Sequence, residues 1–136
     1  MDAASRPAQL PAQGTLAPKL LHAVDARLTP SSPVTDVAEL TSLAAAAVAA
    51  ARGHVLDTSH VIFPNGAITL VLILAESHLS IHTWPEEDLI AIDLFSCGAI
   101  DGEAVISGLA RSLRLDAVSV RTLRRGPGPD GARPPT

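Results

Sequence analysis

The segment "LAESHLSIHTWPEED", residues 74–88, concentrates the side chains of this chain that could take part in a reaction. It holds two histidines, two serines and the only tryptophan, and plain aliphatic runs flank it. The serines, together with Cys97 further along, could act as nucleophiles, and the histidines could act as their bases. Since the chain has no G-x-S-x-G motif, these residue types leave nucleophilic chemistry open without identifying a reaction.

A metal site is a second interpretation, because His78 and His82 are four residues apart. On a helix that spacing puts both rings on one face, where they can share an ion. On a strand the two residues are about 13 Å apart, which is too far for one ion. The neighbouring Ile81, Thr83 and Pro85 favour a strand, so the sequence argues against a metal.

An ordinary half-buried strand is the third interpretation. Residues 77–84 alternate, with Leu79 and Ile81 on one face and His78, Ser80 and His82 on the other. A solvated polar face produces the same pattern. Spacing alone therefore leaves this interpretation open, although it does not account for the histidines and the tryptophan.

The elements that would position this segment follow from periodicity and turn residues. Asp36 or Thr35, and later Asp101, are expected to cap helices, and Pro64-Asn65-Gly66 is expected to turn a β-hairpin. The order of elements predicts an α+β fold, a two-layer α/β sandwich with a mainly antiparallel sheet and helices on one face. Strands are predicted at 19–28, 54–63, 67–76, 77–84, 88–97 and 117–125, and helices at 37–53 and 101–115.

Length and composition predict one domain. Residues 18–125 are expected to fold, and the Pro-rich segments 1–17 and 126–136 are expected to be disordered tails. A net charge of −4 without a long basic cluster argues against nucleic acid as a partner.

Location is predicted from apolar runs and cysteine usage. No run reaches the ~18–20 apolar residues that a membrane span needs, and the first residues lack the apolar core of a secretory signal. A single cysteine, Cys97, cannot form an internal disulfide. We therefore expect a cytoplasmic protein that does not bind membranes.

Two sequence blocks carry a family resemblance. "AESHLSIHTWPE" at 75–86, followed by "AIDLFSCG" at 91–98, closely resembles the short prokaryotic S-adenosylmethionine decarboxylase proenzymes. The resemblance implies self-cleavage between Glu76 and Ser77 into a β chain, 1–76, and an α chain, 77–136. Ser77 would become a pyruvoyl group, the only cofactor, with no metal. His82 would assist processing with support from Thr69, and Cys97 would be the proton donor in turnover.

The implied chemistry explains why reactive side chains crowd together. Ser77 Oγ would attack the carbonyl of Glu76, and elimination of the resulting ester would leave dehydroalanine, which hydrolyses to the pyruvoyl group. A relaxed, planar peptide resists this reaction, so local strain and an oriented base are expected. The keto group would then form a Schiff base with the substrate amine and act as an electron sink.

Substrate choice depends on the pocket. Phe63 and Glu86 match family positions that hold adenine and ribose, and Asp25 stands in for an acid on the first strand. The segment "HAVDARL", 22–28, lacks the aromatics that relatives carry there. S-adenosylmethionine is the favoured substrate, and ornithine or arginine is the alternative.

Two further expectations follow from the resemblance. A homodimer of αβ units and a place in spermidine synthesis are implied for the enzyme. A non-catalytic paralogue that acts as a binding partner is the competing class. The presence of Ser77, His82 and Cys97 together argues against such a paralogue.

Overall fold

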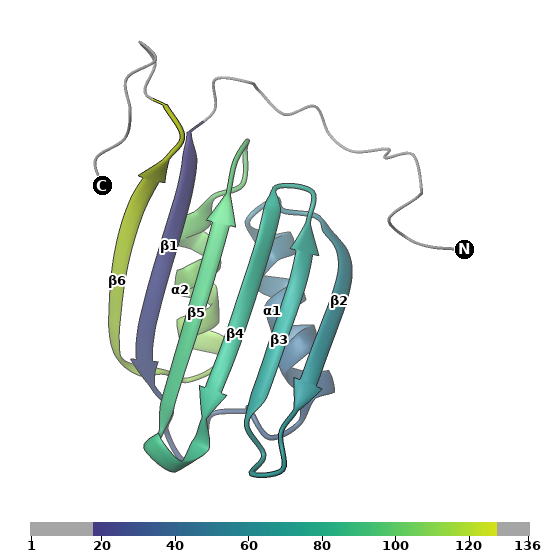
Figure 1. Cartoon of the computed structure of the whole chain (residues 1–136), viewed down its shortest axis with the longest axis vertical. Coiled ribbons are helices and arrows are strands. Elements are labelled where there is room, and N and C mark those ends of the chain that lie inside the picture. The colour runs from purple at the N-terminus through teal and green to yellow at the C-terminus, as the bar shows by residue number, and fades with distance from the viewer. Residues whose placement is uncertain (1–17, 128–136) are drawn as a thin grey trace.

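The computed structural model describes residues 18–127, and within them the chain forms a six-stranded sheet and two α-helices (Figure 1). The predicted tail at 1–17 and residues 128–136 of the predicted C-terminal tail lie outside the described residues. The elements are β1 (Lys19–Arg27), α1 (Val37–Ala50), β2 (Val55–Ile62), β3 (Ile68–Leu74), β4 (Ser77–Trp84), a 3₁₀ turn (Pro85–Glu87), β5 (Leu89–Ser96), α2 (Gly102–Ser112) and β6 (Asp116–Arg125).

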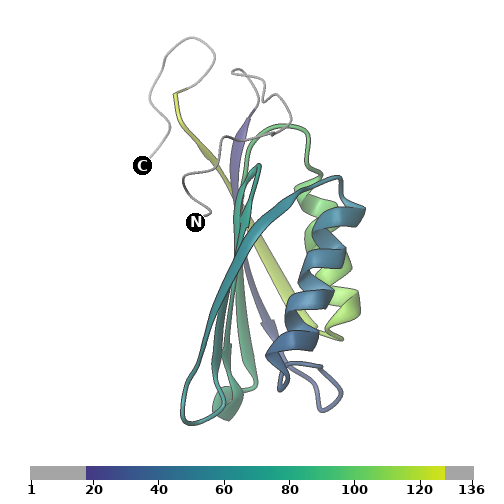
Figure 2. The same cartoon turned by 90° about the vertical axis from the view of Figure 1, so that its right-hand side faces the viewer.

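The strands are arranged in the order β2-β3-β4-β5-β1-β6, and every neighbouring pair is antiparallel. Both helices cover the same face of the sheet (Figure 2). The predicted α+β fold, a two-layer sandwich with helices on one face, is therefore confirmed. Some predicted ends were wrong: the helices end at Ala50 and Ser112, three residues before the predicted ends at 53 and 115. Ala75 and Glu76 form a tight turn instead of ending a strand, because Leu74 pairs directly with Ser77.

Side-chain caps begin both helices, as predicted. Asp36 accepts hydrogen bonds from the amides of Ala38 and Glu39, and Asp101 accepts one from Ala104. Such caps satisfy amides that have no partner within the helix. They also fix where each helix begins, so that its apolar side meets the sheet. The residues buried on these sides are Leu40, Ala44, Ala47 and Val48 of α1 and Val105, Ile106 and Leu109 of α2.

The hydrophobic core lies between the helices and the sheet. On β4, Leu79 and Ile81 are fully buried there, and Ile92 and Leu94 of β5 lie beside them. Burying a side chain of this size stabilises the fold by about 1.5–3 kcal/mol. This burial fixes the register of β4, because a slip by one residue would exchange its two faces.

The alternate residues of the strands lie on the face of the sheet away from the helices, here called the open face. On β4 these residues are His78, Ser80, His82 and Trp84, and the predicted alternation of this strand is confirmed. The open face is turned toward the viewer in Figure 1, and the views agree that no described helix covers it. Among residues 18–127, no helix is long and apolar enough to cross a membrane.

Candidate active site

The predicted cleavage site lies in the turn between β3 and β4. Ser77, the first residue of β4, has a φ of 137°. A side chain rarely adopts such a value, which favours glycine, and holding it costs of order 1–3 kcal/mol. The chain therefore carries backbone strain at the residue whose preceding peptide bond would break.

The carbonyl of Glu76 is held from the neighbouring strand. The pairing of Ser77 with Ser96 brings Cys97 next to the turn. The Cys97 amide donates a hydrogen bond to the Glu76 carbonyl oxygen at 3.0 Å, and the Cys97 thiol lies 3.5 Å from the same oxygen. Two donors on one carbonyl oxygen would stabilise negative charge there if a nucleophile attacked the carbonyl carbon.

The Glu76 side chain is buried, with 4% of the residue exposed, and it has a partner that the sequence did not indicate. The backbone amide of His54 donates to one carboxylate oxygen at 3.0 Å, and His54 Nδ1 lies 2.8 Å from the other. No motif marks His54, which the sequence predicted only as the first residue of a strand. The contact joins residues 22 positions apart, so it depends on the tertiary fold.

His82 and Thr69, the other predicted processing residues, form a pair of their own. They lie directly opposite one another on β4 and β3, and Thr69 Oγ1 is 3.1 Å from His82 Nδ1. This hydrogen bond orients the imidazole on the open face. The ring of Trp84 lies 6.1 Å from that of His82, measured between centroids.

The length of β4 separates the Thr69–His82 pair from the cleavage site at Ser77. Ser77 and His82 are both in β4, five residues apart, which is about 16 Å along the strand. The structure thus brings together Glu76, Ser77 and Cys97, and separately Thr69 and His82. The groups lie too far apart for His82 to take a proton from Ser77 of the same chain.

The three predicted substrate-binding residues also lie away from Ser77. Asp25 and His82 are both paired with Ala91 of β5, so they share one row across the sheet. Glu86 follows β4 and accepts a hydrogen bond from Asn65 Nδ2 at 3.1 Å. Phe63 follows β2 and is 46% exposed. The strands that carry or precede these residues, β1, β2 and β4, end at the lower edge of the sheet in Figure 1, whereas the β3–β4 turn lies at the upper edge.

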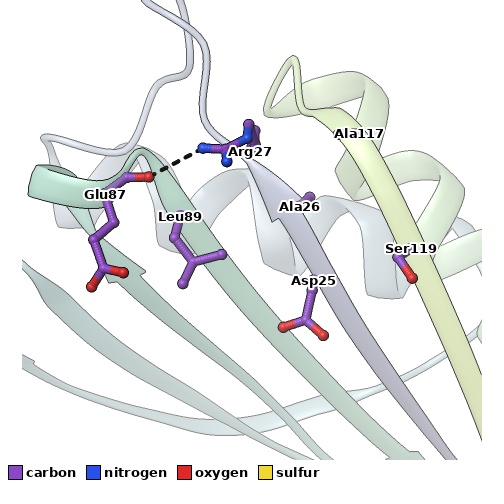
Figure 3. Close-up of a pocket in the computed structure, with 7 residues that line it drawn as sticks. All are labelled: Asp25, Ala26, Arg27, Glu87, Leu89, Ala117 and Ser119. Carbon is purple, nitrogen blue, oxygen red and sulfur yellow. Dashed lines mark hydrogen bonds between the residues drawn. The ribbon is translucent and has the colours of Figure 1, made fainter.

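Asp25 lines a shallow hollow of about 290 Å³ on the sheet (Figure 3). Arg27 closes one side by donating a hydrogen bond to the Glu87 carbonyl oxygen at 3.4 Å. Asp25 also approaches Arg121 at 3.7 Å, but both side chains are exposed, so this ion pair contributes little to stability. The hollow is lined by Asp25, Ala26, Arg27, Glu87, Leu89, Ala117 and Ser119.

His78 and His82 lie on a strand, as the sequence predicted. Among residues 18–127, no group of three or more histidine, cysteine or acidic side chains is arranged to hold a metal.

Comparison with known proteins gives a consistent picture. Residues 21–126 match the family model described as S-adenosylmethionine decarboxylase. A protein of Symbiobacterium thermophilum named S-adenosylmethionine decarboxylase proenzyme is 39% identical over 106 residues, covering 77% of this chain and 80% of that protein.

Two other comparisons extend this result. A Bacillus anthracis protein named S-adenosylmethionine decarboxylase proenzyme 2 is 38% identical over 76 residues, covering 55% of this chain and 62% of that protein. The crystal structure of the adenosylmethionine decarboxylase from Aquifex aeolicus superposes with a TM-score of 0.71 at 26% identity, covering 81% of this chain and 92% of that one.

Proposed function

This chain belongs to the S-adenosylmethionine decarboxylase family, and from that membership we propose that it cleaves itself and then decarboxylates S-adenosylmethionine with a pyruvoyl group made from Ser77. The observation that carries the proposal is the geometry at residues 76 and 77. A strained serine follows a carbonyl group that already accepts two hydrogen bonds from Cys97.

Self-cleavage begins at that carbonyl. Ser77 Oγ attacks the carbonyl carbon of Glu76, and the donors on Cys97 stabilise the oxyanion. The C–N bond then breaks, the amide nitrogen gains the hydroxyl proton, and Glu76 becomes esterified to Ser77. The positive φ of Ser77 assists this step, because breaking the peptide bond releases the strain.

The second step removes the ester. A base takes the Cα proton of residue 77 while the Cβ–Oγ bond breaks, and Glu76 leaves as a carboxylate. Water then replaces the nitrogen of residue 77, which leaves as ammonia, and a keto group is formed. His82, oriented by Thr69, is the base that we propose for these proton transfers.

His82 can serve Ser77 only if it comes from a second copy of the chain. We propose a homodimer in which the open faces meet, at the ~10 Å spacing of packed sheets. We place the two-fold axis between the two sheets and perpendicular to the strands. Facing strands of the two copies then run in opposite directions, so the partner's His82 lies toward Ser77. Exposed apolar side chains on the open face support this contact; they include Val61, Ile73, Trp84 and Leu123.

The same arrangement gives substrate-binding residues to the pyruvoyl end of the partner chain. The partner's Phe63, Glu86 and Asp25 would approach the reacting group, where they would hold the adenine, the ribose and a cationic part of the substrate. The pyruvoyl group supplies an electron-withdrawing carbonyl that binds the substrate amine. Cys97, next to residue 77, is the proton donor that we propose for turnover.

The proposal also includes a location in the cell and a metabolic pathway. A cytoplasmic location is supported by the single cysteine, whose role as a proton donor requires a thiol. The product would be an aminopropyl donor, and spermidine synthesis is the pathway that consumes it.

Purified protein provides the test. Intact-mass measurement should find two chains divided between Glu76 and Ser77, the second lacking a free amine at its N-terminus and reacting with a carbonyl-trapping reagent. The same sample should release carbon dioxide from S-adenosylmethionine, with ornithine and arginine assayed beside it. An active enzyme that consists of one uncut chain would refute the proposal.

A further inference from the structure

We propose that His54 is a positioning residue for self-cleavage, acting through its contacts with Glu76. This inference rests on the proposed function, since it assigns a role in the same cleavage step. His54 and the reacting carbonyl belong to different elements, so only the folded chain brings them together.

Three hydrogen bonds join His54 to the β3–β4 turn. Its amide and its Nδ1 contact the two carboxylate oxygens of Glu76 at 3.0 and 2.8 Å, and its carbonyl oxygen accepts a bond from the Ala75 amide at 2.9 Å. Both turn residues are therefore tied to one residue outside the turn. The Glu76 side chain is only 6% exposed, whereas that of His54 is 55% exposed.

Gly53 holds His54 in this place. A Cβ atom at position 53 would lie 2.6 Å from side-chain atoms of both Ile100 and Val48, so the backbone passes closer to them than a side chain would allow. The Gly53 amide also donates to the carbonyl of Val48 at the end of α1. His54 thus follows a backbone segment that packs closely against the end of α1, and this packing fixes its place beside the turn.

The consequence for the reaction is that Glu76 is held at two points. His54 fixes its carboxylate, and Cys97 fixes its carbonyl oxygen. With both fixed, the carbonyl carbon has little freedom to turn away from Ser77. Holding reacting atoms in an attack geometry supplies much of the acceleration in intramolecular reactions, and a displacement of about 1 Å can cost about 100-fold in rate.

The alternative is that the contact only stabilises the fold. A buried carboxylate that loses its partner destabilises the protein, so a variant could process slowly because less of it is folded. The two roles differ in how splitting follows stability, because a purely structural contact would slow splitting only as far as it lowers the fraction of folded chain. A positioning role requires a hydrogen-bond donor near the place of Nδ1, and it requires that the effect pass through Glu76.

Variants of the uncut precursor distinguish these roles. The rate at which the two chains form is measured by mass spectrometry, together with thermal unfolding. We expect His54→Ala to slow splitting at least tenfold, and His54→Asn, whose amide donates from a similar position, to recover most of the rate. His60→Ala, which removes an exposed histidine from β2, the strand that follows His54, is the matched control and should split like the parent chain.

A double variant supplies the second readout. In a Glu76→Ala background, His54→Ala should cause no further slowing, because the two side chains act as one unit. Parent-like splitting of folded His54→Ala, or equal slowing in both backgrounds, would overturn the inference while the proposed function stands. If the parent chain itself does not split, the proposed function fails first.

Discussion

Ser77 and His82 lie in the same strand, yet the strand keeps them about 16 Å apart, with four residues between them. A serine and its base must come within hydrogen-bonding distance to exchange a proton. The two residues can therefore act on the same bond only when two copies of the chain supply one each. This relationship makes the subunit arrangement testable by mixing variants.

Complementation between two inactive variants is the first prediction. Chains with Ser77→Ala lack the proposed nucleophile, and chains with His82→Ala lack the proposed base. In a mixed dimer one site regains Ser77 from one chain and His82 from the other. We expect the His82→Ala chain to split when it is co-expressed with the Ser77→Ala chain, and to split slowly or not at all alone. Mass spectrometry of differently tagged chains measures this.

The control for complementation is co-expression of the His82→Ala chain with a copy that carries both substitutions. That copy offers no base, so splitting should not recover. Splitting of the His82→Ala chain at the parent rate without a partner would contradict the shared site.

Backbone strain at Ser77 is the basis of the second prediction. Ser77→Ala and Ser77→Gly both remove the proposed nucleophile, so both chains should stay uncut. Glycine accepts a φ of 137° at little cost, whereas alanine keeps the strain. We expect the glycine variant to be more stable by about 1–2 kcal/mol in the free energy of unfolding, measured with urea. Equal stability of the two variants would show that the turn holds no strain at this residue.

Cys97 should affect cleavage and turnover differently. Cys97→Ala removes the thiol but keeps the backbone amide that bonds to the Glu76 carbonyl. We therefore expect splitting to continue, only moderately slower, while carbon dioxide release per pyruvoyl group falls by about 10²–10⁴-fold. Unchanged turnover of the split variant would remove Cys97 from the role of proton donor.

The sequence predicted the elements well because their signals are local. Asp36 and Asp101 mark helix starts, and the alternation of Leu79 and Ile81 with polar residues gives the strand and its buried face. The turn at Ala75 and Glu76 was missed, since neither residue is a typical turn former and the apolar run continues into them.

The residues of the candidate site stay a prediction, and the sequence did not indicate how they lie relative to one another. Ser77, His82 and Cys97 were expected to act together, whereas only Ser77 and Cys97 lie side by side in one chain. The reason is that strand pairing, which decides what lies beside Ser77, depends on contacts between residues far apart in sequence. The hydrogen bond between His54 and Glu76 also joins residues far apart in sequence, so no local pattern indicates it.

Substitutions at Thr69 test whether its hydroxyl orients His82, the proposed base. Its hydroxyl bonds His82 Nδ1, so Thr69→Val removes the hydrogen bond at almost constant volume. We expect splitting to slow about tenfold, the rate equivalent of one hydrogen bond of about 1.4 kcal/mol. Thr69→Ser keeps a hydroxyl and should split almost like the parent chain. Equal rates for the valine and serine variants would mean that this hydroxyl does not orient the base.

Helix α2 provides a prediction about packing, in which two glycines should respond in opposite ways to alanine. A Cβ atom at Gly102 would lie 2.5 Å from His22 Nε2, and His22 is only 3% exposed and bonded through Nδ1 to Thr122. At Gly108 the new Cβ would meet the Ala47 Cβ at 3.6 Å, which is an ordinary contact.

Helix propensity alone favours alanine over glycine by about 1 kcal/mol in a helix interior, so Gly108→Ala should raise the free energy of unfolding by up to that amount. Gly102→Ala should lower it by about 1–3 kcal/mol, because the buried imidazole must move and lose its bond to Thr122. Urea unfolding of both variants checks the pair. Equal stability of Gly102→Ala and Gly108→Ala would contradict this prediction. It would mean that the His22 imidazole can move aside without cost, so that the close contact between β1 and α2 does not exclude a side chain at position 102.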